Sequence, residues 1–141
     1  MKTTSLESTT NPSKNLHIVL WVLQVLLAGF FIIVGYMKLT TPIAAIGAQM
    51  PWVLEYSPFL IRFIGLSQVL GGIGLIIPAA TRIKPFLTTW AAYGLSLIMI
   101  LAALFHLSRG EYSGIIMPLV IAAIAYFIGW ARYKKVPITA R

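Results

Sequence analysis

The sequence contains no cysteine, which excludes structural disulfides, thiolate metal sites and dithiol redox chemistry. Other metal-binding side chains are scarce as well, since 141 residues include only three Asp or Glu residues and two histidines. That supply is too small for a metal site built by this chain alone, so we expect none. Charged residues make up 10% of the chain, far below the roughly 25% typical of soluble domains. A water-facing surface is therefore not expected.

Apolar residues take the place of the missing charges. They form 59% of the chain, and the mean hydropathy is +0.89. Four apolar runs cover 17–37, 59–78, 86–107 and 114–131, and each has about the length that a helix needs to cross a hydrocarbon core. Lipid forces backbone polar groups to pair within their own segment, which favours helices. The pattern predicts an all-α membrane protein, with a four-transmembrane-helix bundle over 16–133.

The polar ends and loops predict the orientation. Residues 1–15 are rich in Ser and Thr and predict a disordered tail, whereas 134–141 form a basic tail. The net charge is +8, but the basic residues stand singly at the ends of apolar runs, so nucleic-acid binding is not expected. Both tails and the 79–85 loop share one side and hold eight of the eleven basic residues. The positive-inside rule then predicts that both termini are cytoplasmic.

The longest connection, residues 40–58, is predicted to face the opposite side. Its three prolines, together with Trp52 and Tyr56, are typical of a short interfacial segment anchored at headgroup depth. A lid over the outer end of the bundle is the alternative.

Six polar residues converge by depth on the outer half of the bundle. Lys38 ends the first run. Arg62 lies at the start of the second run, with Gln68 about 9 Å deeper. The other three lie at or just past the end of the third run. We expect them to form a ligand-binding cluster: Lys38, Arg62, Gln68, His106, Arg109 and Glu111.

Helical spacing indicates which of these side chains face the interior. His106 shares a stripe with Met99, Ala102 and Ala103, and the small residues let a neighbouring helix approach. Gln68 also lies on a stripe of small residues. It is about 120° around the helix from Arg62.

Simpler roles remain open for each residue. Lys38 and Arg62 could snorkel toward the interface, and Gln68 could form an ordinary interhelical hydrogen bond. Arg109 and Glu111 could form a solvated pair in a loop. For an ionisable histidine at membrane depth, a functional role is the default hypothesis.

Several motifs resemble the DoxX-like family of small four-helix bacterial membrane proteins, over about 29–132. They are GYMKL at 35–39, MPWV at 50–53, RFIGLSQVLGGIGLIIPAATRIKP at 62–85 and ALFHLSRGE at 103–111. The family often carries a glutamate where this chain has Gln68. The resemblance implies a multi-pass protein of the bacterial inner membrane, linked as a subunit or accessory to quinone-dependent or sulfur-compound oxidation.

Three functions follow as hypotheses. The first is a redox-linked accessory subunit that binds a lipophilic molecule such as a quinone in the outer half of the bundle. It would have no intrinsic cofactor and no independent catalysis, so electrons would come from a membrane redox partner protein. His106 would bond a carbonyl or move a proton, with Arg62 and Gln68 shaping the polar end.

The alternatives belong to other classes. One is a structural or assembly partner of a larger membrane complex, and a homo-oligomer is also open. The other is a small transporter. Such transporters usually need a carboxylate inside the membrane, and Glu7, Glu55 and Glu111 all fall outside the apolar runs.

Overall fold

Helices account for most of residues 12–141, the part of the chain that the computed structural model describes. Four of them are long and apolar enough to cross a membrane, and no strand occurs among residues 12–141. The predicted four-helix, all-α membrane fold is confirmed. The elements are α1 (Pro12–Thr40), α2 (Ile43–Gln49), the 3₁₀ helix η1 (Pro51–Glu55), α3 (Pro58–Thr81), α4 (Phe86–Ser108), the 3₁₀ helix η2 (Tyr112–Gly114) and α5 (Ile116–Lys134).

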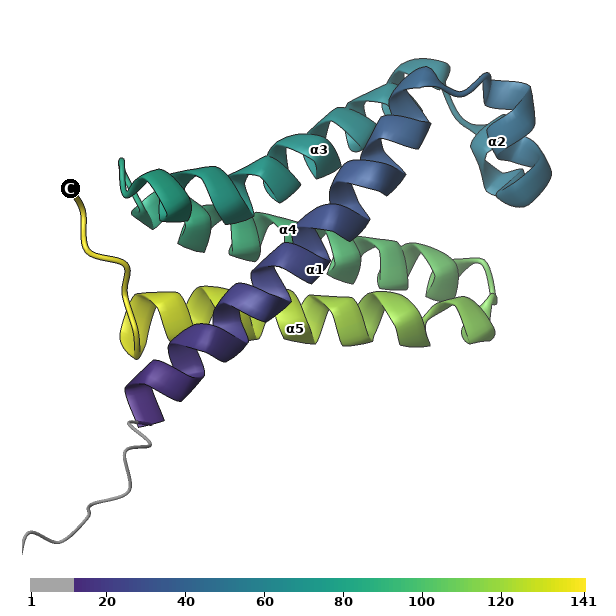
Figure 1. The fold of residues 1–141 in the computed structure, drawn as a ribbon. Helices are drawn as coiled ribbons and strands as arrows, with labels where there is room; N and C mark the ends of the chain where they lie inside the picture. The colour runs from purple at the N-terminus through teal and green to yellow at the C-terminus, as the bar shows by residue number, and fades with distance from the viewer. Residues whose placement is uncertain (1–11) are drawn as a thin grey trace, which may run out of the picture.

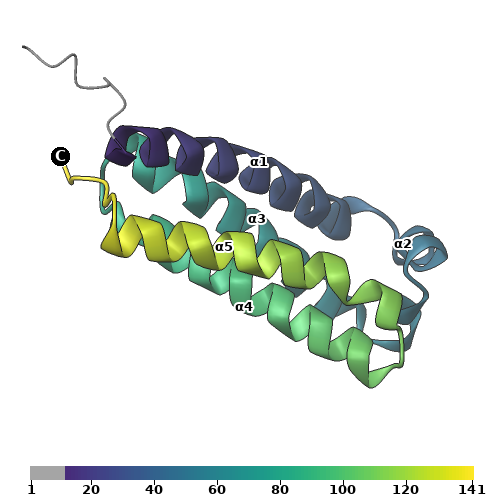
Figure 2. The ribbon, with the colours of Figure 1, turned by 90° about the horizontal axis from the view of Figure 1, so that it is seen from below.

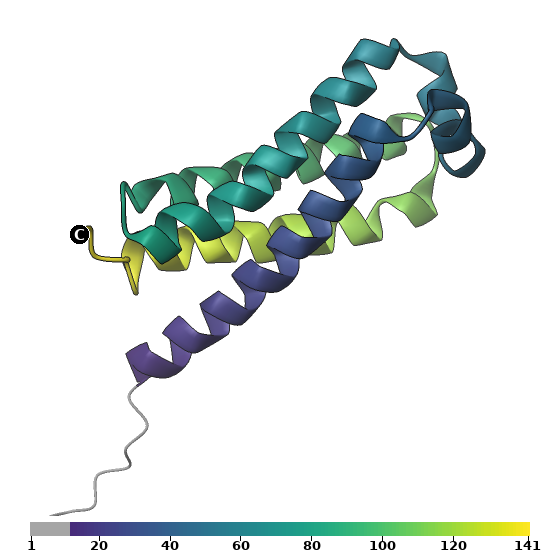
Figure 3. The same ribbon diagram turned by 45° about the horizontal axis from the view of Figure 1, so that its top comes forward.

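The four long helices form an antiparallel bundle in chain order. α1 packs mainly against α3, α3 against α4, and α4 against α5, whereas α1 contacts α5 more lightly. In Figures 1 and 3, α1 crosses the bundle obliquely, and the described chain begins and ends at the same end of the bundle. We name this the terminal end, and the opposite end, which carries α2, the α2 end. Figure 2 shows α4 and α5 side by side along their length.

Some boundaries differ from the predicted ones. α1 begins at Pro12 rather than at 17, because proline fits the first helical turn, where its missing N–H has no partner to lose. Residues 12–15 are therefore helical, and the rest of the predicted disordered tail lies outside the described residues. The other three spans end one to three residues beyond their predicted limits, at Thr81, Ser108 and Lys134.

α3 continues through an internal proline because a neighbouring helix supplies the missing hydrogen bond. Pro78 has no N–H, which leaves the Gly74 carbonyl four residues earlier without its helical donor. The Thr88 hydroxyl on α4 donates to that carbonyl at 3.0 Å. Thr88 is 1% exposed, so the bond is protected from water and ties α3 to α4.

Two glycines set the distance between α1 and α3. A Cβ on Gly35 would lie 2.5 Å from the Gly65 carbonyl oxygen, and one on Gly65 would lie 2.7 Å from the Gly35 carbonyl oxygen. Only glycine permits this backbone contact. The crossing brings the last turns of α1 against the first turns of α3, where three of the predicted site residues lie.

The outside of the bundle is apolar. Large side chains on the long helices, including Leu26, Ile33 and Phe59, are 66%, 70% and 78% exposed. A surface of this kind needs lipid rather than water around it. The chain is therefore a multi-pass membrane protein.

Candidate functional site

A cavity of about 410 Å³ lies between α3 and α4 toward the α2 end, with one wall from α1. Its polar lining includes Lys38 from α1, Gln68 from α3 and His106 from α4. Its remaining walls are mostly apolar and aromatic. The volume lies within the range of about 300–1,000 Å³ typical of small-molecule sites, which combine apolar walls with a few placed polar groups.

Lys38 reaches into this cavity rather than out to the interface. Its Nζ donates to the Oε1 of Gln68 at 3.0 Å, and the two residues are only 8% and 2% exposed. The glycine crossing makes this burial possible, since the Cβ of Lys38 lies 2.8 Å from where a Cβ of Gly65 would stand. Snorkelling of Lys38 is therefore wrong, and the interhelical hydrogen bond expected for Gln68 is confirmed.

Arg62, unlike the other predicted residues, bonds backbone carbonyls at the end of α1. Its Nη1 donates to the Lys38 carbonyl at 2.7 Å and to the Thr41 carbonyl at 2.8 Å. These carbonyls lie at the end of α1, where no further helical N–H follows to bond them and where a cation is favoured. Arg62 thus caps α1 and is absent from the lining of the cavity, so it does not stand at the polar end of the pocket.

The turn after α4 brings a carboxylate back to the histidine. Gly110 has a φ of +71°, and its N–H bonds the Leu107 carbonyl at 3.1 Å, while the Glu111 N–H bonds the His106 carbonyl at 2.9 Å. This pair of bonds is a Schellman motif, which favours glycine at the left-handed position. As a result, the Glu111 Oε2 lies 2.8 Å from the Nδ1 of His106.

Arg109 connects the same carboxylate to η1. Its Nε donates to the Oε1 of Glu111 at 2.6 Å, and its Nη1 and Nη2 donate to the two carboxylate oxygens of Glu55. These bonds hold the pKa of Glu55 below its usual range, and bonds from Arg109 and then His106 do the same for Glu111. The two carboxylates in turn raise the pKa of Arg109. The expected pair of Arg109 and Glu111 is confirmed, and the residue that sequence reasoning missed is Glu55.

Aromatic side chains cover the α2 end of the cavity. The rings of Trp52 and Tyr56 lie 5.1 and 5.6 Å from the ring of Phe105, each in an edge-on arrangement, and all three line the cavity. The 40–58 connection therefore packs over the site through its second half. Phe105 stands directly before His106 in the sequence. This position beside the histidine was the only feature of the sequence that could have indicated its contact with Trp52 and Tyr56.

The outer rim of the cavity consists of apolar side chains. Leu60, Phe63 and Leu101 line it and are also 39%, 56% and 55% exposed on the outside of the bundle. In a bilayer this outer surface faces the acyl chains. The cavity thus combines a buried polar wall with a rim that meets lipid.

Of the six predicted residues, Lys38, Gln68 and His106 line the cavity, and Glu111 and Arg109 are linked to it through His106. The sixth, Arg62, does not line the cavity but bonds the Lys38 carbonyl at the end of α1. The residues at the cavity present an ammonium and an imidazole that is hydrogen-bonded to a carboxylate.

The comparisons with known proteins identify one family. The sequence model of the DoxX-like family matches residues 22–128 of the chain. No curated protein and no solved structure matches it. The matched range contains every residue that lines the cavity, whereas the end of α5 and the segment that follows it lie beyond the match.

Proposed function

The chain belongs to the DoxX-like family, and from this premise we propose that it binds a lipophilic molecule with a carbonyl-bearing head, such as a quinone, between α3 and α4. The protein would act as a redox-linked accessory subunit rather than as an independent enzyme. In the bacterial inner membrane, with both termini in the cytoplasm, the cavity would lie in the outer half of the bilayer.

The observation that carries the proposal is the buried ammonium of Lys38. No carboxylate among the described residues forms an ion pair with this ammonium. The ammonium has three N–H donors, and Gln68 accepts a hydrogen bond from one of them. A buried cation without an anion is costly, so an electron-rich oxygen in the cavity would stabilise it. A ligand carbonyl provides such an oxygen, and the ammonium favours any negative charge that the oxygen gains.

The amide at position 68 supports this proposal. A glutamate there, as the family resemblance implies for many relatives, would neutralise the ammonium of Lys38 within the protein. Gln68 instead accepts one hydrogen bond and leaves the positive charge uncompensated. The charge is then available to a ligand.

His106 is the residue that we assign to proton movement. Its Nδ1 is engaged with Glu111 at 2.8 Å, which leaves Nε2 as the ring nitrogen that a ligand can use. The carboxylate holds the imidazole ring in place through Nδ1, so the free Nε2 can exchange a proton with a ligand oxygen. Glu111 is 39% exposed in its side chain and provides the link to water.

The donor set and the volume of the cavity suit a quinone head. The head would lie against Lys38 and His106, and the isoprenoid tail would leave over Phe63 and Leu101 into the bilayer. A bound quinone would supply two-electron redox chemistry, with electrons from a membrane redox partner protein. The chain itself holds the head, excludes water with the aromatic cover and handles the proton at Nε2.

The test is a titration of the protein in lipid nanodiscs with a short-tailed benzoquinone, followed by quenching of tryptophan fluorescence. Trp52 lines the cavity and should be quenched with saturation, so Trp52→Phe identifies the saturable part of the signal. Lys38→Met and His106→Ala should each weaken the apparent affinity about tenfold, the effect of one charge-assisted hydrogen bond.

Lys14→Met is the matched control, since Lys14 is an exposed lysine at the terminal end of the same helix. It should bind the quinone like the wild type. Linear, unsaturable quenching that is equal in all variants would mean that the quinone only partitions into the bilayer, and the proposal would fail.

A further inference from the structure

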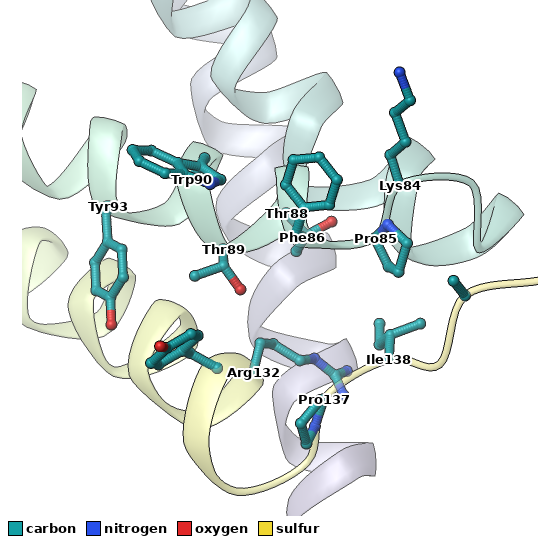
Figure 4. Close-up of a pocket in the computed structure, with 12 residues that line it drawn as sticks. Lys84, Pro85, Phe86, Thr88, Thr89, Trp90, Tyr93, Arg132, Pro137 and Ile138 are labelled. Atoms are coloured by element: carbon teal, nitrogen blue, oxygen red, sulfur yellow. The ribbon is translucent and has the colours of Figure 1, made fainter.

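A second cavity, of about 710 Å³, lies at the terminal end of the bundle between the start of α4 and the segment 135–141. Figure 4 shows this segment passing below Lys84 and Pro85. Two bonds hold it there, from the Arg82 Nε to the Thr139 carbonyl at 2.7 Å and from the Arg141 N–H to the Arg82 carbonyl at 2.9 Å. The predicted basic tail therefore forms one wall of a cavity.

Arg132 lines this cavity, and one of its nitrogens has no hydrogen-bond acceptor among the described residues. It is only 3% exposed, and its Nε donates to the Oε1 of Gln24 at 2.7 Å. Its Nη1 donates to the Nδ1 of His17 at 2.8 Å and to the Val136 carbonyl at 3.2 Å. Because a guanidinium only donates, this nitrogen of His17 must be the acceptor. The Nη2 is buried and has no hydrogen-bond partner among the described residues.

None of these partners carries a negative charge. The ion pairs among the described residues involve only Glu55 and Glu111, both at the α2 end. The ring of Trp21 lies 5.7 Å from the guanidinium carbon, but a buried guanidinium that lacks an anion and a hydrogen-bond partner for one nitrogen remains costly. The site is therefore incomplete in a way that an anion would complete.

The mouth of the cavity indicates what kind of anion fits. Phe86, Trp90 and Tyr133 line it and are 56%, 70% and 64% exposed on the outside of the bundle. Aromatic side chains of this kind lie at headgroup depth in membranes. In Figure 4, Lys84 extends away from the guanidinium of Arg132, which leaves a second, exposed cation at the rim.

We propose that this second cavity binds the phosphate of an anionic lipid headgroup, with the Nη2 of Arg132 donating to a phosphate oxygen. The aromatic mouth would hold the glycerol and the start of the acyl chains, which free phosphate lacks. Arginine suits this role because its planar donors match phosphate oxygens. Arg132 and the segment after it lie beyond the family match at 22–128, so the site is proposed for this chain and not for its family.

The test measures the thermal stability of the detergent-purified protein with a short-chain phosphatidylglycerol, with the matching phosphatidylcholine, and with inorganic phosphate. Phosphatidylglycerol alone should raise the apparent Tm, in a saturable manner. Equal stabilisation by phosphatidylcholine, whose choline balances the phosphate charge, would show that the net negative charge of the headgroup is not recognised. An equal shift with inorganic phosphate would assign the site to the free ion. Either result would overturn the proposal.

A variant that keeps Arg132 avoids the risk of a folding defect. Thr89→Glu introduces a carboxylate into the cavity that Arg132 also lines, so the protein should stay folded while its affinity for phosphatidylglycerol falls about tenfold or more. Asn15→Glu adds the same charge at the same end outside the cavity, at an exposed position of α1, and should keep the response. An undiminished response in Thr89→Glu would contradict the proposal.

Discussion

Replacing Gly35 by alanine should separate α1 from α3 and disturb the cavity at the same time. The added Cβ would stand 2.5 Å from the Gly65 carbonyl oxygen and 2.8 and 2.9 Å from two atoms of Val69. Non-bonded carbon contacts are optimal at about 3.5–4.0 Å, so the helices must move apart by about 1 Å. Two of the three atoms belong to the backbone, so rotation of a side chain cannot relieve the contact.

The size of the effect follows from a comparison with Gly29→Ala on the same helix. A Cβ at Gly29 meets nothing within 4 Å, and both substitutions gain the same helix propensity of about 0.8–1.0 kcal/mol. The difference between them isolates the steric cost, about 1–3 kcal/mol for overpacking. For a chain of this length, Gly35→Ala should have an apparent Tm roughly 3–10 °C below that of Gly29→Ala.

The assay is thermal unfolding in detergent, followed by the quinone titration on both variants. Separation of the helices moves Lys38, one turn after Gly35, away from Gln68, so Gly35→Ala should also bind the quinone more weakly. Gly29→Ala should bind it like the wild type. Equal Tm values for the two variants would refute the close glycine crossing and, with it, the reason given for the burial of Lys38.

Three further predictions concern individual polar contacts. Thr88→Val should lower the free energy of unfolding by about 1–3 kcal/mol, because the α3 carbonyl freed by the proline loses its donor; urea or thermal unfolding measures this, and an unchanged midpoint would contradict it. Gln68→Leu should cost about 1.5–3 kcal/mol by leaving the ammonium of Lys38 without a partner, and adding Lys38→Met should restore most of the lost stability in the same assay. The pKa of Glu55 is lowered from its usual value of 4.5, so its stabilising contact is present above that pH and is lost as the pH falls below it. Below this pH, pepsin cleavage within η1 of the wild type, divided by that of Arg109→Gln at the same pH, should therefore rise toward one, because the ratio cancels the pH dependence of pepsin itself; a ratio that does not change with pH would contradict the contact.

The spans and the depth of the polar residues could be predicted because they depend on local pattern. Apolar run length decides which segments cross a membrane, and small residues beside His106 decide which face of α4 turns inward. The Schellman turn at Gly110 also follows from local chemistry, since glycine favours a positive φ after a helix.

The partners of these residues could not be predicted, because depth along a helix says nothing about which atoms meet across the bundle. Arg62 bonds the end of α1 and Arg109 bonds Glu55, which lies 54 residues away. Gln24 lies inside an apolar run and gave no signal, yet it accepts a bond from Arg132 across 108 residues. Such contacts depend on how the helices and the connections between them are placed in space, which local sequence pattern does not give.

The most direct test of the account is photocrosslinking with a quinone that carries a diazirine near its ring, followed by mass spectrometry of the labelled peptides. In nanodiscs, the label should concentrate on the cavity-facing parts of 60–68 and 98–106, and excess unlabelled quinone should remove it. Lys38→Met should reduce the labelling, whereas Lys14→Met should not. Labels spread evenly over the lipid-facing sides of all four helices, without competition, would contradict the existence of a quinone site.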